Sequence, residues 1–277
     1  MSGRSVLTEG KTKLVVLGDQ PGTVLLIAKD DITAGDGAKH EVIPRKGVYA
    51  TATTEACFRL LASHGLPTHY LGPINERTFA ARMVHMIPLE VVMRRRAAGY
   101  YLKRHPAVES GTLFKELQLE YYLKDGPMHD PLALVDSHTR TLRLYRADRP
   151  LDDGFIGEQV LDLSPLIDLT PEIELRLQLL SIGAFQVLEE AWARRGVTLV
   201  DLKIECGFDA ETGELLIADV VDNDSWRIWV GGREAEMLDK QVFRNLEAGL
   251  TGPALEAALR QIAHMYMRVA QETACFN

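Results

Sequence analysis

The sequence predicts an α+β fold with a smaller strand-rich N-terminal lobe, residues 1–88, and a larger α+β C-terminal lobe, residues 89–277. Three observations predict it. Short β-compatible runs dominate the first ninety residues, apolar residues recur at helical spacing in two later stretches, and strands and helices alternate without a regular βαβ rhythm. Since a cleft between two lobes is the usual place for a ligand, we expect the functional site there.

The β-compatible runs of the N-terminal lobe are separated by glycine, proline and Asn-Glu turns. They cover residues 13–16, 23–28, 68–72, 78–85 and 89–93. One helix interrupts them, with apolar residues on one face. For this helix the sequence predicts an N-cap at Thr53 or Thr54 and a stop at Gly65.

The C-terminal lobe has stronger signals. Thr170, a proline and two acids start a helix whose apolar residues step by three or four until Gly196. Residues 197–205 alternate as a strand, with Asp201, Lys203 and Glu205 on one face. A turn at residues 209–213 and a strand over 214–221 complete a hairpin, and a helix begun by Gly252-Pro253 ends the chain. Residues 132–165 have weak periodicity, so we expect an irregular excursion there.

Composition narrows the class of protein. With 277 residues, 46% hydrophobic and 25% charged, the chain has the composition of a globular protein, which excludes disordered and fibrous classes. The net charge of −8 argues against a sequence-independent nucleic-acid partner. The N-terminus lacks the apolar core of a secretory signal, no stretch is long enough to cross a membrane, and three cysteines show no CxxC spacing. We therefore expect a cytoplasmic protein without membrane or nucleic-acid partners.

Two N-terminal segments have the chemistry of anion binding. Lys11 and Lys13 are two residues apart, a spacing that on a strand points both ammonium groups to one face, where they could hold a phosphate chain. A charged edge strand explains them as well. Residues 32–38 place glycines around Asp36, whose carboxylate could bind a metal or a substrate amine. An ordinary surface loop is the alternative.

Three arginines, Arg94 to Arg96, follow an apolar strand and precede two alanines and Gly99. Small residues let a backbone approach a ligand, and guanidinium groups donate in pairs to phosphate or carboxylate. The other interpretation is a solvated basic face, because alternate residues at a strand end point in opposite directions.

The predicted hairpin brings Lys203, Glu205 and Asp219 together. Two carboxylates on adjacent strands can share a divalent cation, and a nearby lysine suits a transferring phosphoryl group. A surface Lys–Glu pair is the alternative, because Asp219 lies opposite Glu205 only if the turn has the right length. Residues 222–229, dense in polar side chains, follow as an expected substrate-recognition loop.

In this order the segments resemble the SAICAR synthetase (phosphoribosylaminoimidazole-succinocarboxamide synthase) family over nearly the whole chain. The matching segments are EGKTK (9–13), ITAGDGA (32–38), RKG (45–47), MIPLEVVMRRRAAG (86–99), LKR (102–104), MHDP (128–131), LVDLKIECG (199–207), ADVVDNDSWRIW (218–229) and DKQVFR (239–244). The resemblance implies a two-lobed fold with an ATP-grasp-like nucleotide cleft. It implies an ATP- and Mg²⁺-dependent ligase, a homo-oligomer, that joins carboxyaminoimidazole ribonucleotide to L-aspartate through an acyl phosphate.

The resemblance also implies a role for each matching residue. Lys203 and Asp36 would act in catalysis, and Glu205 and Asp219 would bind Mg²⁺. Four residues would bind ATP, the lysines at its phosphates and the other two at the adenine-ribose hinge: Lys11, Lys13, Met86 and Glu90. Seven would line the substrate pocket: Arg94, Tyr100, His129, Asp130, Arg227, Lys240 and Arg244.

Three departures from the family pattern cluster on the substrate side. Tyr100 stands where the family has a phosphate-binding serine, Gly126-Pro127 replaces an Asp-Ala pair, and residues 48–51 replace an asparagine-bearing stretch. These changes leave a paralogous ligase open, one that acts on a different heterocyclic acid in nucleoside natural-product biosynthesis. A kinase sharing the nucleotide cleft and a silent nucleotide-binding regulator also stay open, and the sequence does not decide the acid, the amine or the pathway.

Overall fold

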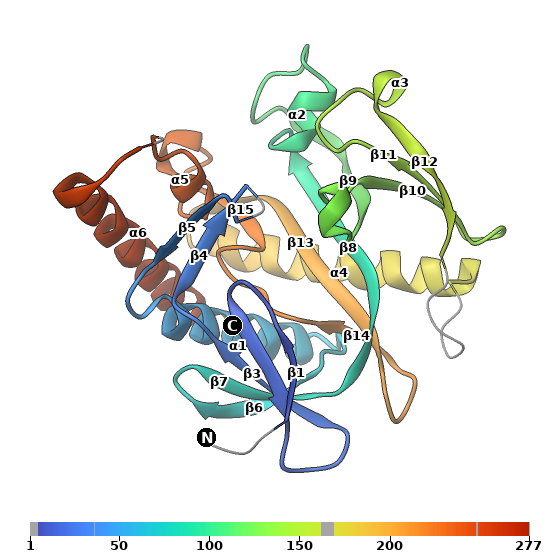
Figure 1. The fold of residues 1–277 in the computed structure, drawn as a ribbon, viewed down its shortest axis with the longest axis horizontal. Helices are drawn as coiled ribbons and strands as arrows, with labels where there is room; N and C mark the ends of the chain where they lie inside the picture. The colour runs from blue at the N-terminus through green and yellow to red at the C-terminus, as the bar shows by residue number, and fades with distance from the viewer. Residues whose placement is uncertain (1–4, 36, 162–168, 248, 277) are drawn as a thin grey trace.

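The computed structural model describes residues 5–35, 37–161, 169–247 and 249–276, and it confirms the α+β prediction. Two antiparallel sheets form the framework, the smaller one built from the N-terminal part of the chain (Figure 1). Helices lie against both sheets, and one continuous hydrophobic core connects them. None of the helices among the described residues is long and apolar enough to cross a membrane.

The small sheet has five strands and is covered on one face by helix α1 (Lys46–Ser63). In spatial order its strands are β1 (Val6–Glu9), β2 (Lys13–Leu17), β3 (Thr23–Ala28), β7 (Thr78–Arg82) and β6 (Tyr70–Asn75). A separate hairpin of β4 (Asp31–Ala34) and β5 (Lys39–Val42) leads from this sheet into α1. The predicted run 23–28 matches β3 residue for residue.

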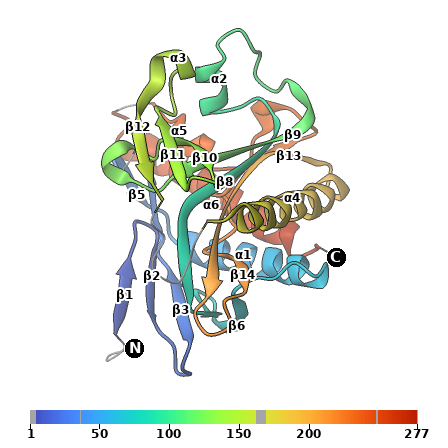
Figure 2. The ribbon, with the colours of Figure 1, turned by 90° about the vertical axis from the view of Figure 1, so that its right-hand side faces the viewer.

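The large sheet is centred on two 13-residue strands, β8 (Val84–Arg96) and β13 (Val197–Asp209), which pair along most of their length. Its other strands are β12 (Phe155–Val160), β11 (Thr141–Tyr145), β10 (Leu132–Asp136), β9 (Leu113–Leu123), β14 (Leu215–Ala218) and β15 (Trp226–Val230). Helix α4 (Pro171–Arg194) runs along one face of this sheet (Figure 2). The predicted boundary at residue 88 falls inside β8, a strand whose pairing partners β9 and β13 both belong to the large sheet.

The remaining helices are short, except for the last. They are α2 (Tyr100–Arg104), α3 (Leu151–Gly154), α5 (Gln241–Arg244) and α6 (Gly252–Thr273), with 3₁₀ turns η1 (Gly126–Met128) and η2 (Glu234–Glu236). The starts predicted for α4 and α6 are confirmed, and the Thr170 hydroxyl accepts a hydrogen bond from the Ile173 N–H as an N-cap should. Helix α6 packs against α1, so the C-terminal helix covers an element of the N-terminal part.

The N-cap predicted at Thr53 or Thr54 is wrong, because α1 begins seven residues before Thr53, at Lys46. Its cap comes from another part of the chain: the Asp30 carboxylate accepts hydrogen bonds from the N–H groups of Arg45 (3.1 Å) and Gly47 (2.9 Å). Gly47 is required there, because a Cβ atom would lie 2.9 Å from the Ala28 carbonyl oxygen. A cap supplied by tertiary contact leaves no local signal in the sequence.

The irregular excursion expected over residues 132–165 is also wrong for its described part. Strands β10, β11 and β12 form an antiparallel meander that extends the large sheet from β9. The two strands nearer the sheet centre each contain buried residues, whereas the edge strand β12 is exposed along almost its whole length. Residues 162–168 lie outside the described part of the chain.

Candidate active site

Two carboxylates meet where β13 and β14 pair. Glu205 lies opposite Ala218 in the ladder, and Asp219 follows directly with a left-handed backbone (φ 63°). His69 supports this conformation, because its Nε2 donates to the Asp219 carbonyl oxygen at 3.0 Å. Burial lowers the pKa of His69 to about 4, so the ring is neutral at pH 7. The turn therefore places Ala218, and not Asp219, opposite Glu205, and Asp219 is the next residue along the chain.

Lysines surround these carboxylates. Lys203 donates to Glu205 at 2.9 Å and lies 3.3 Å from Glu90, while Lys124 donates to the other Glu205 oxygen at 2.5 Å. Lys13 forms an ion pair with Asp219. Glu205 is only 3% exposed, so the interpretation as a surface Lys–Glu pair is wrong.

Electrostatics keep Glu205 and Lys203 charged. Burial raises the pKa of Glu205, but Lys203 and Lys124 outweigh it and hold the pKa well below its usual range. Burial lowers the pKa of Lys203, but Glu205, Glu90 and Asp219 outweigh it and hold the pKa well above its usual value. A cluster of charged groups with opposite signs on neighbouring strands can bind both a cation and a phosphate.

The expected nucleotide residues lie on the strands around this cluster. Lys13 is the first residue of β2, whereas Lys11 is exposed in the turn before it, next to Gly37. Met86 and Glu90 both lie on β8, opposite Gly207 and Glu205 of β13 respectively. Met86 is 38% exposed. Asp36 lies outside the described residues.

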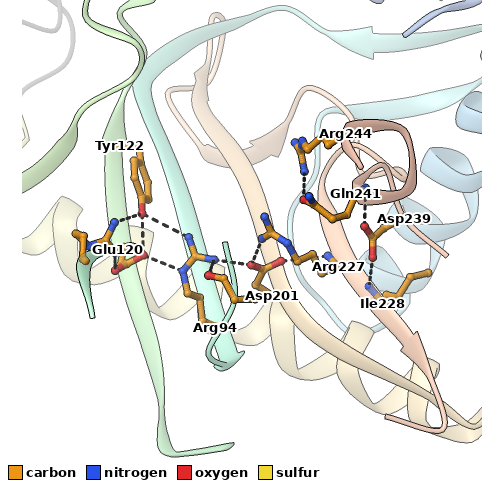
Figure 3. A network of polar contacts seen from close by, with 11 residues as sticks. Arg94, Glu120, Tyr122, Asp201, Arg227, Ile228, Asp239, Gln241 and Arg244 are labelled. Atoms are coloured by element: carbon orange, nitrogen blue, oxygen red, sulfur yellow. Dashed lines mark hydrogen bonds and ion pairs between the residues drawn. The ribbon is translucent and has the colours of Figure 1, made fainter. Parts of the chain in front are cut away.

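Arg94 lies inside a buried chain of alternating charges that crosses β9, β8, β13 and β15 (Figure 3). Its Nε donates to Glu120 at 2.8 Å, and its Nη1 donates to Asp201 at 2.5 Å. Asp201 also accepts from Arg227 at 2.5 Å, and Glu120 is paired with Arg104. The Arg94 guanidinium already binds two carboxylates of the protein. A role in substrate binding would therefore have to be combined with these two ion pairs.

Arg227 and Arg244 are the other arginines of this region, on β15 and α5. The Arg227 guanidinium lies directly against Gly99, where a Cβ atom would come within 2.5 Å of Nη2. Arg244 donates to Gln241 at 3.3 Å, and desolvation together with the positive charge of Arg227 lowers the pKa of Arg244. Lys240, just before α5, donates to Asp224 at 3.0 Å. Two neighbouring guanidinium groups and an ammonium favour an anionic ligand at this end of the cleft.

Tyr100 does not fill a buried pocket. It is the first residue of α2, its side chain is 44% exposed, and the Lys103 ammonium lies 5.1 Å from its ring centroid. Because the Tyr100 ring lies on the surface, the space beside Gly99 is occupied by the Arg227 guanidinium instead.

The MHDP segment forms a tight turn. His129 and Asp130 both have left-handed backbones, and the Asp130 carboxylate accepts from the Asp125 N–H at 2.8 Å. Asp125 also caps η1, so a carboxylate remains next to the Gly126-Pro127 pair.

Several site residues were not anticipated from the sequence. Lys124, His69 and Glu120 hold the carboxylates or the arginines in place, but each acts on a partner more than twenty residues away. For Glu120 a weak signal exists, because an acid in the β-compatible stretch LFKELQLEYYL requires a cationic partner if it is buried.

Comparison with known proteins identifies the group to which this arrangement belongs. The family model described as SAICAR synthetase matches residues 6–258. The chain belongs to the SAICAR synthetase family. The phosphoribosylaminoimidazole-succinocarboxamide synthase of Chloroflexus aurantiacus is 43% identical over 271 residues, which are 97% of this chain and 95% of that protein. The resemblance found in the sequence is thereby confirmed.

Solved structures of SAICAR synthetases have the same fold. The enzyme from Ehrlichia chaffeensis superposes with a TM-score of 0.78 at 25% identity and covers 99% of this chain and 100% of its own. A type-2 SAICAR synthetase in complex with ADP superposes with a TM-score of 0.73 at 26% identity, over 95% of this chain and 98% of its own. The two-sheet framework that carries Lys13, Glu205 and Asp219 is therefore the SAICAR synthetase framework.

Proposed function

We propose that this protein is a ligase that joins carboxyaminoimidazole ribonucleotide (CAIR) to L-aspartate at the expense of ATP, giving SAICAR in purine biosynthesis. The observation that carries this proposal is the cluster of Glu205 and Asp219 with Lys13 and Lys203, in a chain that belongs to the SAICAR synthetase family. Membership of the family supports the reaction class, and the cluster supplies charged groups suited to a transferring phosphoryl group.

ATP would lie between the two sheets, with its phosphates at Lys11 and Lys13 and its base near Met86 and Glu90. Lys13 supports this placement, because it projects from the small sheet onto Asp219 of the large one. The neighbour solved with ADP supports nucleotide binding by this fold.

Glu205 and Asp219 fit a Mg²⁺ ion by their chemistry. Both offer carboxylate oxygens, and ammonium groups lie against each of them, at positions that favour a cation. The described residues contain no group of three or more His, Cys, Asp or Glu side chains placed to hold a metal, which suits an ion bound by one or two carboxylates plus phosphates and water. When bound, Mg²⁺ would neutralise and orient the phosphate oxygens.

The reaction then needs two displacements. A carboxylate oxygen of CAIR attacks the γ-phosphorus of ATP, and the bond to the bridging oxygen breaks to release ADP. The amine nitrogen of aspartate attacks the resulting acyl carbon, the acyl C–O bond breaks, and phosphate leaves with that oxygen. The aspartate ammonium group loses two protons in all, and one N–H remains in the amide. Lys203 would place positive charge beside the moving phosphoryl group, and most of the remaining rate would come from positioning.

The phosphate of CAIR would bind at Arg227 and Arg244, where the absence of a side chain at Gly99 lets the Arg227 guanidinium approach the backbone. Lys240, His129 and Asp130 lie on the surrounding loops, and Asp36 keeps its predicted catalytic role. The paralogous ligase with another acid gains no support, because the matched relatives are SAICAR synthetases and the Tyr100 ring does not block a pocket. The cytoplasmic location and the homo-oligomer remain predictions.

The direct test is an assay of the purified protein with ATP, CAIR and aspartate. We expect ADP and SAICAR in equal amounts, and no sustained ADP release when either the acid or the amine is left out. ADP release that needs only one acceptor would indicate a kinase instead.

A further inference from the structure

The segment of residues 67–69 joins the two sheets close to the candidate active site. It runs beside β14 of the large sheet, where the Ile217 N–H donates to the Pro67 carbonyl at 3.0 Å and the His69 N–H donates to the Ile217 carbonyl at 2.9 Å. The His69 carbonyl in turn accepts from the N–H of Arg82, at the end of β7 in the small sheet, at 2.7 Å. The backbone of His69 is therefore held by both sheets.

The His69 ring is fixed from the side of the small sheet. The residue is 2% exposed, and its ring lies edge-on against Phe58 of α1, 5.4 Å between centroids, and against Phe79 of β7, 5.9 Å between centroids. The Nε2 atom of this ring donates to the carbonyl oxygen of Asp219, the residue that follows β14. The ring therefore fixes Asp219 of the large-sheet part relative to the elements that build and cover the small sheet.

Asp219 needs this support because its backbone is left-handed, with φ 63°. A residue other than glycine disfavours this region, and the net stabilisation from one buried hydrogen bond is of the same order as that preference. The backbone at Asp219 also sets the direction of its carboxylate, which forms an ion pair with Lys13. Without the hydrogen bond from His69, the backbone would gain other conformations, and in those the carboxylate would leave its place beside Lys13.

We propose that His69 is a positioning residue of the ligase, which holds the backbone of Asp219 so that the carboxylate points to the Mg²⁺ ion and the ATP phosphates. The inference rests on the proposed function, in which Asp219 and Glu205 bind Mg²⁺. His69 itself touches neither substrate nor metal and acts only through Asp219. A histidine that only fills the core affects stability, whereas a positioning histidine also affects the affinity for the metal.

Two substitutions separate the hydrogen bond from the packing. His69→Gln keeps an N–H donor at about the place of the ring Nε2, whereas His69→Leu fills space without a donor. The probe is Mn²⁺, which takes the same oxygen ligands as Mg²⁺, and its binding in the presence of ADP is measured by electron paramagnetic resonance. We expect the Kd for Mn²⁺ to rise about 3- to 10-fold in His69→Leu and to stay within about twofold of wild type in His69→Gln. The Mg²⁺ concentration for half-maximal SAICAR formation should rise in His69→Leu by the same factor.

Phe58→Leu is the matched control, because it removes a ring that packs on His69 and leaves the Nε2 hydrogen bond in place. It should lower the thermal midpoint, since buried aromatic surface is lost, and keep the Kd for Mn²⁺ within about twofold of wild type. If His69→Leu does not fold, His69→Asn takes its place. The asparagine amide is one methylene group shorter than that of glutamine and does not reach the Asp219 carbonyl, so this variant should show the same weaker binding.

An unchanged Kd for Mn²⁺ in folded His69→Leu would overturn the assignment. Equal rises in His69→Leu and Phe58→Leu, or a rise in His69→Gln as large as that in His69→Leu, would also overturn it, because they would indicate an effect of packing alone. Binding of Mn²⁺ with ADP requires neither CAIR nor aspartate. A wild-type protein that binds Mn²⁺ but forms no SAICAR therefore contradicts the ligase function, while the variants still decide the role of His69. A wild-type protein that binds no Mn²⁺ with ADP would overturn the metal site and the role of His69 together.

Discussion

Asp219 combines two features that are seldom found together in one residue. Its carboxylate pairs with Lys13 from the other sheet, and its backbone is left-handed without being glycine. The His69 ring, neutral and buried, fixes this backbone through the Asp219 carbonyl oxygen. Strain held in place by a specific hydrogen bond is typical of a residue retained for function.

Asp219→Asn should therefore leave the protein folded and remove most ATP turnover. The amide has the same shape and can keep the backbone conformation, since asparagine tolerates left-handed φ better than most residues. It is, however, a much weaker ligand for a hard cation. We expect turnover to fall at least about 100-fold at saturating Mg²⁺, with a thermal midpoint close to that of wild type. Wild-type turnover in the variant would contradict a metal-binding role.

Tyr100 is the residue at which the chain departs most visibly from its family, and its exposed ring predicts a small functional effect. Because the ring lies against Lys103 rather than against Arg227, Tyr100→Ser should change the KM for CAIR by less than about threefold. Steady-state kinetics with CAIR as the varied substrate measure this. A tenfold fall in KM would show that the ring obstructs the phosphate site after all.

At the scale of elements, four strands are joined by the charges of Glu120, Arg94, Asp201 and Arg227 (Figure 3). Burial raises the pKa of Glu120, but Arg94 and Arg104 outweigh it and hold the pKa below its ordinary value. A carboxyl with a lowered folded-state pKa stabilises the fold above its ordinary pKa, and this stabilisation is lost as the pH falls through the lowered value.

Glu120→Gln should destabilise the protein by about 3–5 kcal/mol at pH 7, because it leaves two buried arginines without a shared carboxylate. Below about pH 4.5 the wild type should lose stability more steeply than the variant, since only the wild type has to protonate this group. Urea unfolding at a series of pH values measures both effects. Parallel pH profiles for the two proteins would contradict this, because they would show that folding does not lower the pKa of Glu120.

Some elements could be predicted from the sequence and others could not, for physical reasons. The start of α4 has a local cap and a proline, so Thr170-Pro171 was enough to place it. The start of α1 depends on Asp30, and no window around Lys46 contains that information. Strand β12 has no buried face, so its sequence lacks the alternation that predicts a strand.

At the scale of the whole molecule, the site is assembled from segments far apart in the chain. Lys13 and Asp219 are separated by 206 positions and belong to different sheets. The sequence could predict the chemistry of Lys203, Glu205 and Asp219, because the hairpin between them is local. It could not predict Lys124 or His69, whose contacts depend on how β8, β9 and the small sheet come together.

The proposed ligase function requires that a carboxylate, and not a hydroxyl or water, accepts the phosphoryl group. Transfer of an oxygen atom tests this most directly. CAIR labelled with ¹⁸O in its carboxylate is converted with ATP and aspartate, and the inorganic phosphate is analysed by mass spectrometry. An acyl phosphate route places one ¹⁸O atom in each phosphate released. Phosphate without ¹⁸O, formed together with SAICAR, would contradict it.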